Sequence, residues 1–157
     1  IYDIHTIYEI AGFKAKALYA ASHIEGGDKI AAQQNDPLNP NGLSMSDSEG
    51  YYLNVQYDVL ATAATRYKLP LFIQYDVVDP TKDVADKNGN AVASYDYLDS
   101  NGLQTASTNT KETTTTVGLN FFPHAQVVLK MDYAMTNMDA AAAEDYNTFS
   151  LGLGFIF

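Results

Sequence analysis

The chain ends with the segment TFSLGLGFIF, residues 148–157, whose side chains alternate strictly in character. Every second residue from Phe149 onward is large and apolar, while three of the four residues between them are serine or glycine. Successive side chains of a β-strand point to opposite faces. The segment therefore predicts a strand with one apolar face and one almost bare face, which at the exposed edge of a soluble sheet would promote aggregation.

The same two-residue period recurs in six earlier segments, so the sequence predicts about seven strands. The earlier ones lie near residues 2–10, 13–22, 51–59, 67–77, 114–121 and 126–135. Their connections alternate between short and long, and the long ones are expected near residues 24–49, 79–111 and 137–146. This spacing predicts an all-β antiparallel sheet whose long connections all lie at one end.

Composition excludes several classes of protein. The formal net charge of -10 argues against nucleic-acid binding, which needs basic surface, and the absence of cysteine excludes disulfides. No apolar run approaches the ~18 residues of a membrane-spanning helix, but a spanning strand needs only ~9–11 residues with one apolar face. A low mean hydropathy of -0.18 is therefore compatible with a membrane protein that crosses with strands.

One face of the predicted strands is apolar, and in five of them it carries an aromatic residue near each end, while the other face carries Lys, Asp, Asn, Gln, Gly and Ser. The paired aromatics are six to eight residues apart, roughly 20–26 Å along a strand, close to the ~25 Å apolar band of an outer-membrane barrel. Strands survive in hydrocarbon only when every backbone group is paired. These features favour a transmembrane β-barrel over a soluble sandwich, whose strands would also alternate.

The barrel interpretation assigns each face a role. The expected lipid-facing aromatic girdle consists of Tyr2, Tyr8, Phe13, Tyr19, Tyr51, Tyr57, Tyr67, Tyr75, Phe121, Tyr133, Phe149 and Phe157. The expected pore-lining residues are Asp3, His5, Glu9, Lys14, Lys16, Asn54, Gln56, Asp58, Lys68, Gln74, Asp76, Asn120, Gln126, Lys130 and Asp132. Because outer-membrane barrels keep their short turns in the periplasm, the C-terminus is expected on the periplasmic side.

Several segments resemble the C-terminal part of bacterial outer-membrane porins of the phosphate-selective porin-like family. They are YDIHTIYEIAGFKAKALYA, SEGYYLNVQYDVL, LPLFIQYDV, TVGLNFFPHAQVVLKMDY and the terminal FSLGLGFIF. The resemblance implies a large, usually trimeric barrel of about 16–18 strands in the outer membrane of a Gram-negative bacterium. Residues 1–157 would then be the C-terminal portion of one barrel domain, with the N-terminal strands on a further part of the protein, and the terminal Phe157 resembles a barrel-assembly signal.

The expected function is a water-filled channel for passive diffusion of ions and small hydrophilic solutes. Its expected partners are outer-membrane lipid, the remaining barrel strands and two further copies in a homotrimer. Any phosphate selectivity would have to come from the remaining strands of the barrel, because Arg66 is the only arginine here and acidic residues balance the pore-lining lysines. The alternative is a structural or surface-interaction barrel with little conductance, used for adhesion, docking or complex assembly. A soluble carbohydrate-binding sandwich is a third possibility.

Motifs of other functions are weak. The segment DKNGN, residues 86–90, matches only part of a calcium loop and is interpreted as a turn. The three histidines lie far apart in the sequence, and Ser22 and His23 are strand neighbours that point to opposite faces. We therefore expect no catalytic site, no metal site and no cofactor.

Overall fold

A computed structural model of the chain describes residues 1–26, 29, 44–85, 91–92, 96–98, 104–107, 110–140 and 143–155. Its regular elements in these ranges are strands: β1 (Tyr2–Ile10), β2 (Phe13–His23), β3 (Ser44–Asp58), β4 (Pro70–Ala85), β5 (Ala91–Val92), β6 (Asp96–Leu98), β7 (Gln104–Ser107), β8 (Glu112–His124), β9 (Val127–Met138) and β10 (Tyr146–Phe155).

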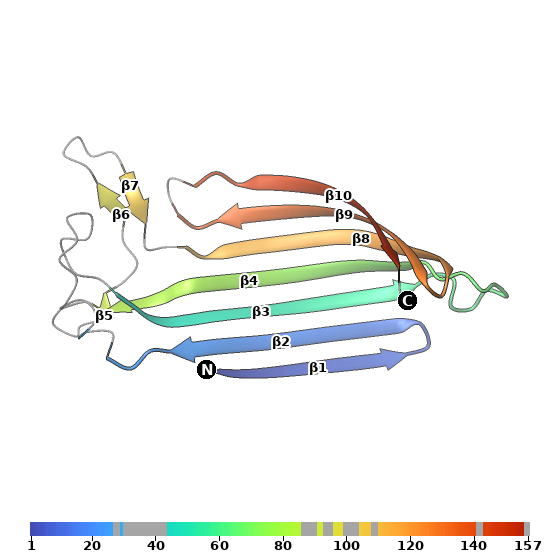
Figure 1. The fold of residues 1–157 in the computed structure, drawn as a ribbon, viewed down its shortest axis with the longest axis horizontal. Coiled ribbons are helices and arrows are strands. Elements are labelled where there is room, and N and C mark those ends of the chain that lie inside the picture. Colours follow the sequence, from blue (N-terminus) through green and yellow to red (C-terminus); the bar gives the residue numbers. More distant parts are fainter. Residues whose placement is uncertain are drawn as a thin grey trace.

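Seven long strands form one antiparallel sheet in the order β1-β2-β3-β4-β8-β9-β10, which follows the chain (Figure 1). The short strand β5 pairs with the end of β4, and β6 and β7 form a separate hairpin. The prediction of an all-β antiparallel sheet of about seven strands is confirmed. The sheet is not closed: β1 and β10 are its two edges, at opposite sides of Figure 1.

The connections differ at the two ends of the sheet. At one end, β1 and β2 are joined by Ala11 and Gly12, which both have positive φ, as a two-residue type I′ hairpin turn requires. At the same end, residues 59–69 join β3 to β4 and residues 125–126 join β8 to β9. We call this the turn end and the opposite one the loop end. Asp58 organises the middle connection, since its Oδ1 accepts hydrogen bonds from the backbone N–H groups of Leu60 and Leu69.

Strand pairing continues beyond the apolar segments that predict it. Strand β3 begins at Ser44 and β4 ends at Ala85, so both strands reach into segments expected to be long loops. Polar contacts accompany this extension, such as the 2.6 Å hydrogen bond between the hydroxyls of Ser22 and Ser48. Backbone pairing needs no apolar alternation, which explains why the period of two does not mark these strand ends.

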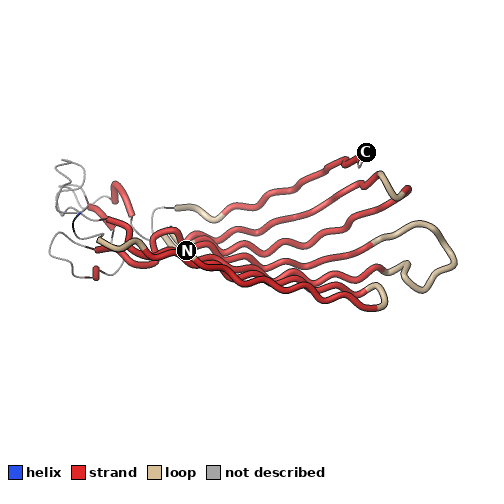
Figure 2. The backbone as a smooth tube through the Cα atoms, turned by 60° about the horizontal axis from the view of Figure 1, so that its bottom comes forward, coloured by secondary structure: helices blue, strands red, loops and turns tan. Residues whose placement is uncertain are grey.

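The sheet has no hydrophobic core. Among the described apolar residues only Val77, Val84 and Val128 are buried, and no described side chain is less than 2% exposed. The accessible surface is 10393 Å², whereas a compact monomer of this mass exposes roughly 7,800 Å². Figure 2 shows a single curved layer of strands rather than two packed layers.

Candidate functional site: two unlike faces of one sheet

The strand register brings most of the polar residues singled out in the sequence onto one face. Directly paired residues point to the same side of a sheet, and chains of pairing such as Glu9–Lys14–Gln56 connect the positions across strands. This polar face carries Asp3, His5, Glu9, Lys14, Lys16, Asn54, Gln56, Asp58, Gln74, Asp76, Asn120, Lys130 and Asp132.

A depression of about 390 Å³ lies in the middle of the polar face. Two lysines and four amide side chains line it together with two aromatic residues: Lys16, Tyr52, Asn54, Gln56, Phe72, Gln74, Asn120 and Lys130. A second hollow of about 440 Å³, toward the turn end, includes Glu9, Lys14, Asp58 and Lys68 in its lining. The polar face is therefore concave and contains both charges and neutral hydrogen-bonding groups.

A chain of hydrogen bonds crosses the central depression. The Nδ2 of Asn54 donates to Oε1 of Gln74 at 2.9 Å, and the Nε2 of Gln74 donates to Oδ1 of Asp76 at 2.9 Å. Asn54 is only 8% exposed, so its partner on β4 satisfies an amide that would otherwise be buried alone. These bonds fix the direction of polar side chains on the two central strands.

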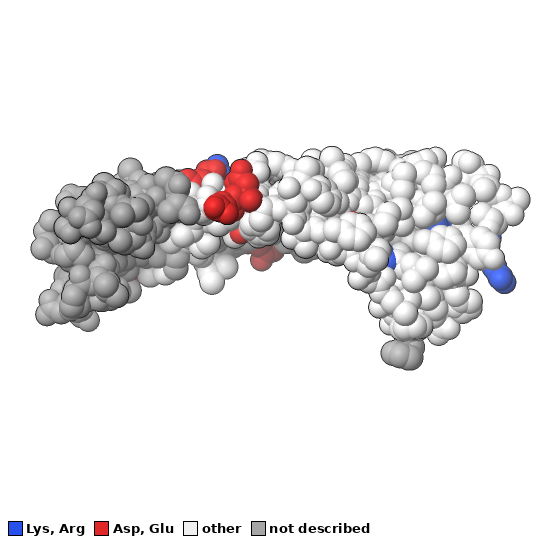
Figure 3. All heavy atoms as spheres, turned by 90° about the horizontal axis from the view of Figure 1, so that it is seen from above, with Lys and Arg blue, Asp and Glu red and all other residues white. Residues whose placement is uncertain are grey.

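The opposite face is apolar and exposed. Its largest side chains include Leu53, Ile73 and Leu151, which are 51%, 51% and 73% exposed. From β1 to β10, the rows of paired residues through Leu71 and Ile73 contain only apolar side chains. Figure 3, which shows the molecule from above, has few charged atoms along the strands: acidic atoms gather beside the loop end with a basic residue next to them, and the other basic atoms lie toward the turn end.

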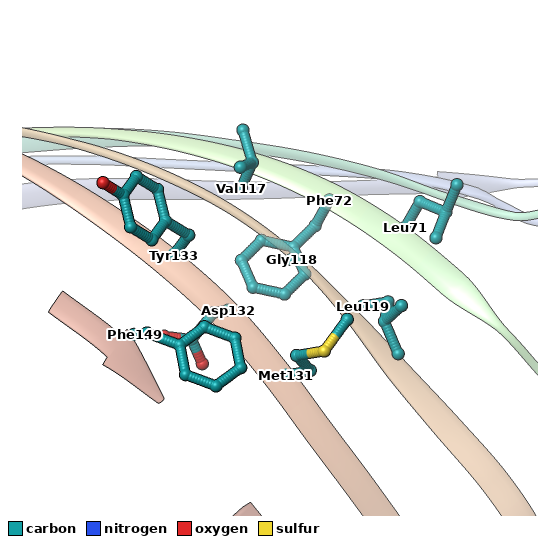
Figure 4. Close-up of a pocket in the computed structure, with 9 residues that line it drawn as sticks. All are labelled: Leu71, Phe72, Val117, Gly118, Leu119, Met131, Asp132, Tyr133 and Phe149. Atoms are coloured by element: carbon teal, nitrogen blue, oxygen red, sulfur yellow. The ribbon is translucent and has the colours of Figure 1, made fainter. Parts of the chain in front are cut away.

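A shallow hollow of about 380 Å³ lies on this apolar face around Gly118 (Figure 4). Its lining is mostly apolar, formed by Leu71, Val117, Leu119, Met131, Tyr133 and Phe149, and Asp132 also contributes to it. On the other side of the sheet, the Phe72 ring covers Gly118 so closely that an added Cβ would lie 2.6 Å from Cζ of Phe72. Glycine is therefore required here for the close approach of an aromatic ring to the backbone of the neighbouring strand.

Aromatic residues form two lines across the apolar face. The line nearer the loop end, which we call the upper girdle, consists of Tyr2, Tyr19, Tyr51, Tyr75, Tyr133 and Phe149. It does not follow the register: Tyr19 pairs with Tyr51, but Tyr51 pairs with Val77, which is two residues from Tyr75. Over the six steps from β1 to β10 the girdle moves six residues toward the turn end.

The second line, the lower girdle, moves by the same amount. It consists of Tyr8, Phe13, Tyr57, Phe121 and Phe155. On β2 the girdle residue Phe13 lies two residues from Ala15, the partner of Tyr8. On β10 the girdle residue Phe155 lies two residues from Leu153, which is level with Phe121 in the register because both pair with the same residue of β9. The total is again six residues in six steps, so both girdles run at one fixed angle to the strands.

That angle follows from elementary sheet dimensions. One residue of about 3.3 Å per strand spacing of about 4.8 Å corresponds to a strand tilt of about 35°. Exposed Ile10 and Val59 extend the apolar band beyond the lower girdle, to about eight residues in all. With this tilt, eight residues span about 22 Å perpendicular to the girdles.

Charged residues reappear on the apolar face above the upper girdle. Glu49 Oε2 accepts hydrogen bonds from Nζ of Lys82 at 2.7 Å and from the hydroxyl of Tyr19 at 3.1 Å. The Lys82 ammonium holds the pKa of the Glu49 carboxyl below its ordinary value of 4.5. Burial raises the pKa of the nearby Asp79. In the described part of the chain, the face between the two girdles contains no charged residue.

Three residues of the sequence assignment are not on strands. Tyr67 and Lys68 lie in the connection before β4, where the Tyr67 ring is 5.9 Å from that of Phe121 and Lys68 forms an isolated bridge with Phe122. Gln126 belongs to the turn before β9 and not to the strand in which the alternation places it. Phe157 lies outside the described residues, and so does the segment 86–90.

Several residues of the polar face are absent from the sequence assignment because their side chains are aromatic or only weakly polar. Tyr52 and Phe72 line the central depression, and Thr114 and Thr136 form a hydroxyl–hydroxyl hydrogen bond of 3.0 Å between β8 and β9. The strand period alone places them there. Among the described residues, no cluster of His, Asp or Glu is arranged to hold a metal ion.

Within the described ranges, no helix is long and apolar enough to cross a membrane. Comparisons with protein-family models, curated proteins and solved structures found no significant match to this chain.

Proposed function

We propose that this chain is part of the wall of an outer-membrane porin, a channel through which ions and small hydrophilic solutes diffuse passively. The observation that carries the proposal is the exposed apolar face, which has no charge between two aromatic girdles and no second layer packed against it in the described part. A soluble sandwich would bury this face in a core between two sheets. Hydrocarbon is the other environment that tolerates it.

The geometry of the girdles supports a membrane boundary. The tilt of about 35° and the apolar height of about 22 Å agree with the ~35–45° and ~25 Å of outer-membrane barrels. Two aromatic lines with the same inclination are expected where the two interfaces of one bilayer cross a set of tilted strands. The hollow around Gly118 has the apolar lining to accept part of a lipid acyl chain.

Closing the barrel requires further strands beside β1 and β10. Both edge strands run from the loop end to the turn end, so an antiparallel closure needs an odd number of additional strands and gives an even total. The polar face would then surround the water-filled interior, with the turn end in the periplasm. We further propose that the protein belongs to a porin-like family and that its diffusion channels assemble as trimers.

Cysteine scanning combined with conductance tests this function. The chain contains no cysteine, so Thr116→Cys on the polar face and its neighbour Val117→Cys on the apolar face each introduce one thiol. The intact protein in a planar bilayer should conduct, and a charged, membrane-impermeant thiol reagent should reduce the current only for Thr116→Cys. Absence of conductance, or equal modification of the two variants, would refute the proposal.

A further inference from the structure

The tilt of the strands changes which charges on the polar face lie at the same height. Lys16 pairs, through Asn54, Gln74 and Thr116, with Ala134 on β9, four residues from Lys130. Four strand steps separate β2 from β9, and at one residue per step the two lysines lie level. Both lysines indeed line the same central depression.

These two lysines form a positive level. In the described part of the chain, neither Lys16 nor Lys130 forms an ion pair with a carboxylate. Their neighbours in the depression are amides and aromatic rings, which carry no charge. We name this pair of ammonium groups the lysine level.

Below the lysine level the charges balance. Lys14 Nζ is 3.0 Å from Oε2 of Glu9, while Asp58 and Lys68 line the same hollow near the turn end. Two positive and two negative groups therefore give no net charge at this end of the polar face.

Above the lysine level the wall is acidic. Asp132 is two residues above Lys130 on β9, and Asp76 is four residues above the same level on β4 after the tilt is included. When the tilt is included, Asp3 on β1 and Glu112 on β8 lie closer to the loop end than Asp132 does. These four carboxylates, which we name the acidic zone, lie on average about four residues, or about 11 Å, above the lysine level.

We infer that this arrangement makes the proposed channel a rectifier, which passes more current when the loop side is positive. The inference rests on the proposed porin function. With the loop side positive, cations enter through the acidic zone while anions approach through the lysine level, so both carriers accumulate where the two zones meet. With the opposite polarity both carriers are drawn away from that junction, and the current falls.

The separation of the zones sets the salt dependence. The Debye length is about 10 Å at 0.1 M salt and about 3 Å at 1 M, so the two zones act on the permeating ions at the lower concentration and are screened at the higher one. A unit charge about 10 Å away in unscreened water changes the local ion concentration by roughly twofold, and one Debye length of screening lowers this to roughly 1.3-fold, so the two to four charges of each zone together supply a change of roughly twofold. We therefore expect roughly twofold rectification at 0.1 M salt and nearly symmetric currents at 1 M.

The test compares two double variants in the intact protein. Lys16→Gln with Lys130→Gln should abolish rectification at 0.1 M KCl and increase the preference for K⁺ over Cl⁻. Asp76→Asn with Asp132→Asn should also reduce rectification but shift the preference toward Cl⁻. Opposite shifts in selectivity distinguish the two zones from a general change in pore shape.

Two controls accompany the variants. Lys82→Gln removes one positive charge on the other face, beyond the upper girdle, and should leave rectification and selectivity unchanged. Native conductance at 1 M KCl verifies that each variant has assembled. Insertion direction is read from a bulky thiol label at Ala63→Cys, in the connection at the turn end, accessible from one chamber.

The outcomes separate the inference from the function on which it depends. A symmetric native current at 0.1 M KCl, or rectification that survives both double variants, would overturn the inference and leave the channel intact. An absence of any current would overturn both. Loss of rectification in the lysine variant, together with a shift of selectivity toward K⁺, would support the inference that the lysine level and the acidic zone rectify the current.

Discussion

A single lysine at the centre of the apolar face distinguishes a membrane environment from water. Ile73 lies on the central strand β4 between the two girdles, paired with Val55 and Val117. Its side chain is 51% exposed, and both neighbouring strands are present. The substitution Ile73→Lys places an ammonium group near the middle of the proposed bilayer.

The two environments predict different losses of stability. A lysine on the lipid face at the bilayer midplane destabilises a barrel by about 2–4 kcal/mol, a factor of roughly 30 to 1000 in the folding equilibrium. In water, the substitution removes the contribution of a half-buried isoleucine, about 1 kcal/mol, and the new charge is solvated. A loss above about 2 kcal/mol therefore indicates hydrocarbon.

The assay is urea-driven unfolding of the intact protein from lipid vesicles. Gln56→Lys is the matched control, because Gln56 lies on the neighbouring strand β3 but lines the central depression of the polar face. The control should lose less than about 1 kcal/mol, since its ammonium remains in water. Equal losses for the two variants would refute the assignment of the two faces.

Three further outcomes follow from local geometry. Ala11→Asn should stabilise the protein by about 1 kcal/mol in chemical unfolding, because Ala11 has a φ of 48°, which asparagine tolerates better; no gain would contradict the type I′ turn. Gly118→Ala should destabilise it by about 1–3 kcal/mol in the same assay, since a Cβ would crowd the Phe72 ring; an unchanged value would argue against this contact. The Glu49–Lys82 contribution, which depends on a carboxylate with a lowered pKa, should be present above pH 4.5 and be lost on acidification, so Lys82→Gln should weaken the pH dependence of unfolding there; an unaltered pH profile would contradict the pairing.

The sequence predicts the faces of this sheet well because the strand period is two. Each long strand keeps its alternation over nine or more residues, so residues such as Lys16 and Asp132 fall on the polar side without any knowledge of the neighbours. The same reasoning cannot give strand ends. Pairing at Ser44 and at Ala85 depends on the partner backbone and not on hydrophobicity.

Relative heights are also hidden from the sequence. Lys16 and Lys130 are more than a hundred residues apart in the sequence, and their common height depends on the tilt and on the registers of four successive strand pairs. Gln126 is misplaced for a related reason: the polar–apolar alternation continues into the turn, while the register shift after Phe121 ends the strand pair sooner.

The register irregularities indicate where alternation is structurally required. One extra residue inside a strand turns every following side chain to the other face. In the described part of the long strands, the shifts occur between Met45 and Glu49, above the upper girdle, and between Phe121 and His124, at the lower one. Pairing between the girdles runs without a shift on every neighbouring strand pair. Irregular pairing is thus absent from the stretch between the girdles, which is the distribution expected if that stretch lies in hydrocarbon.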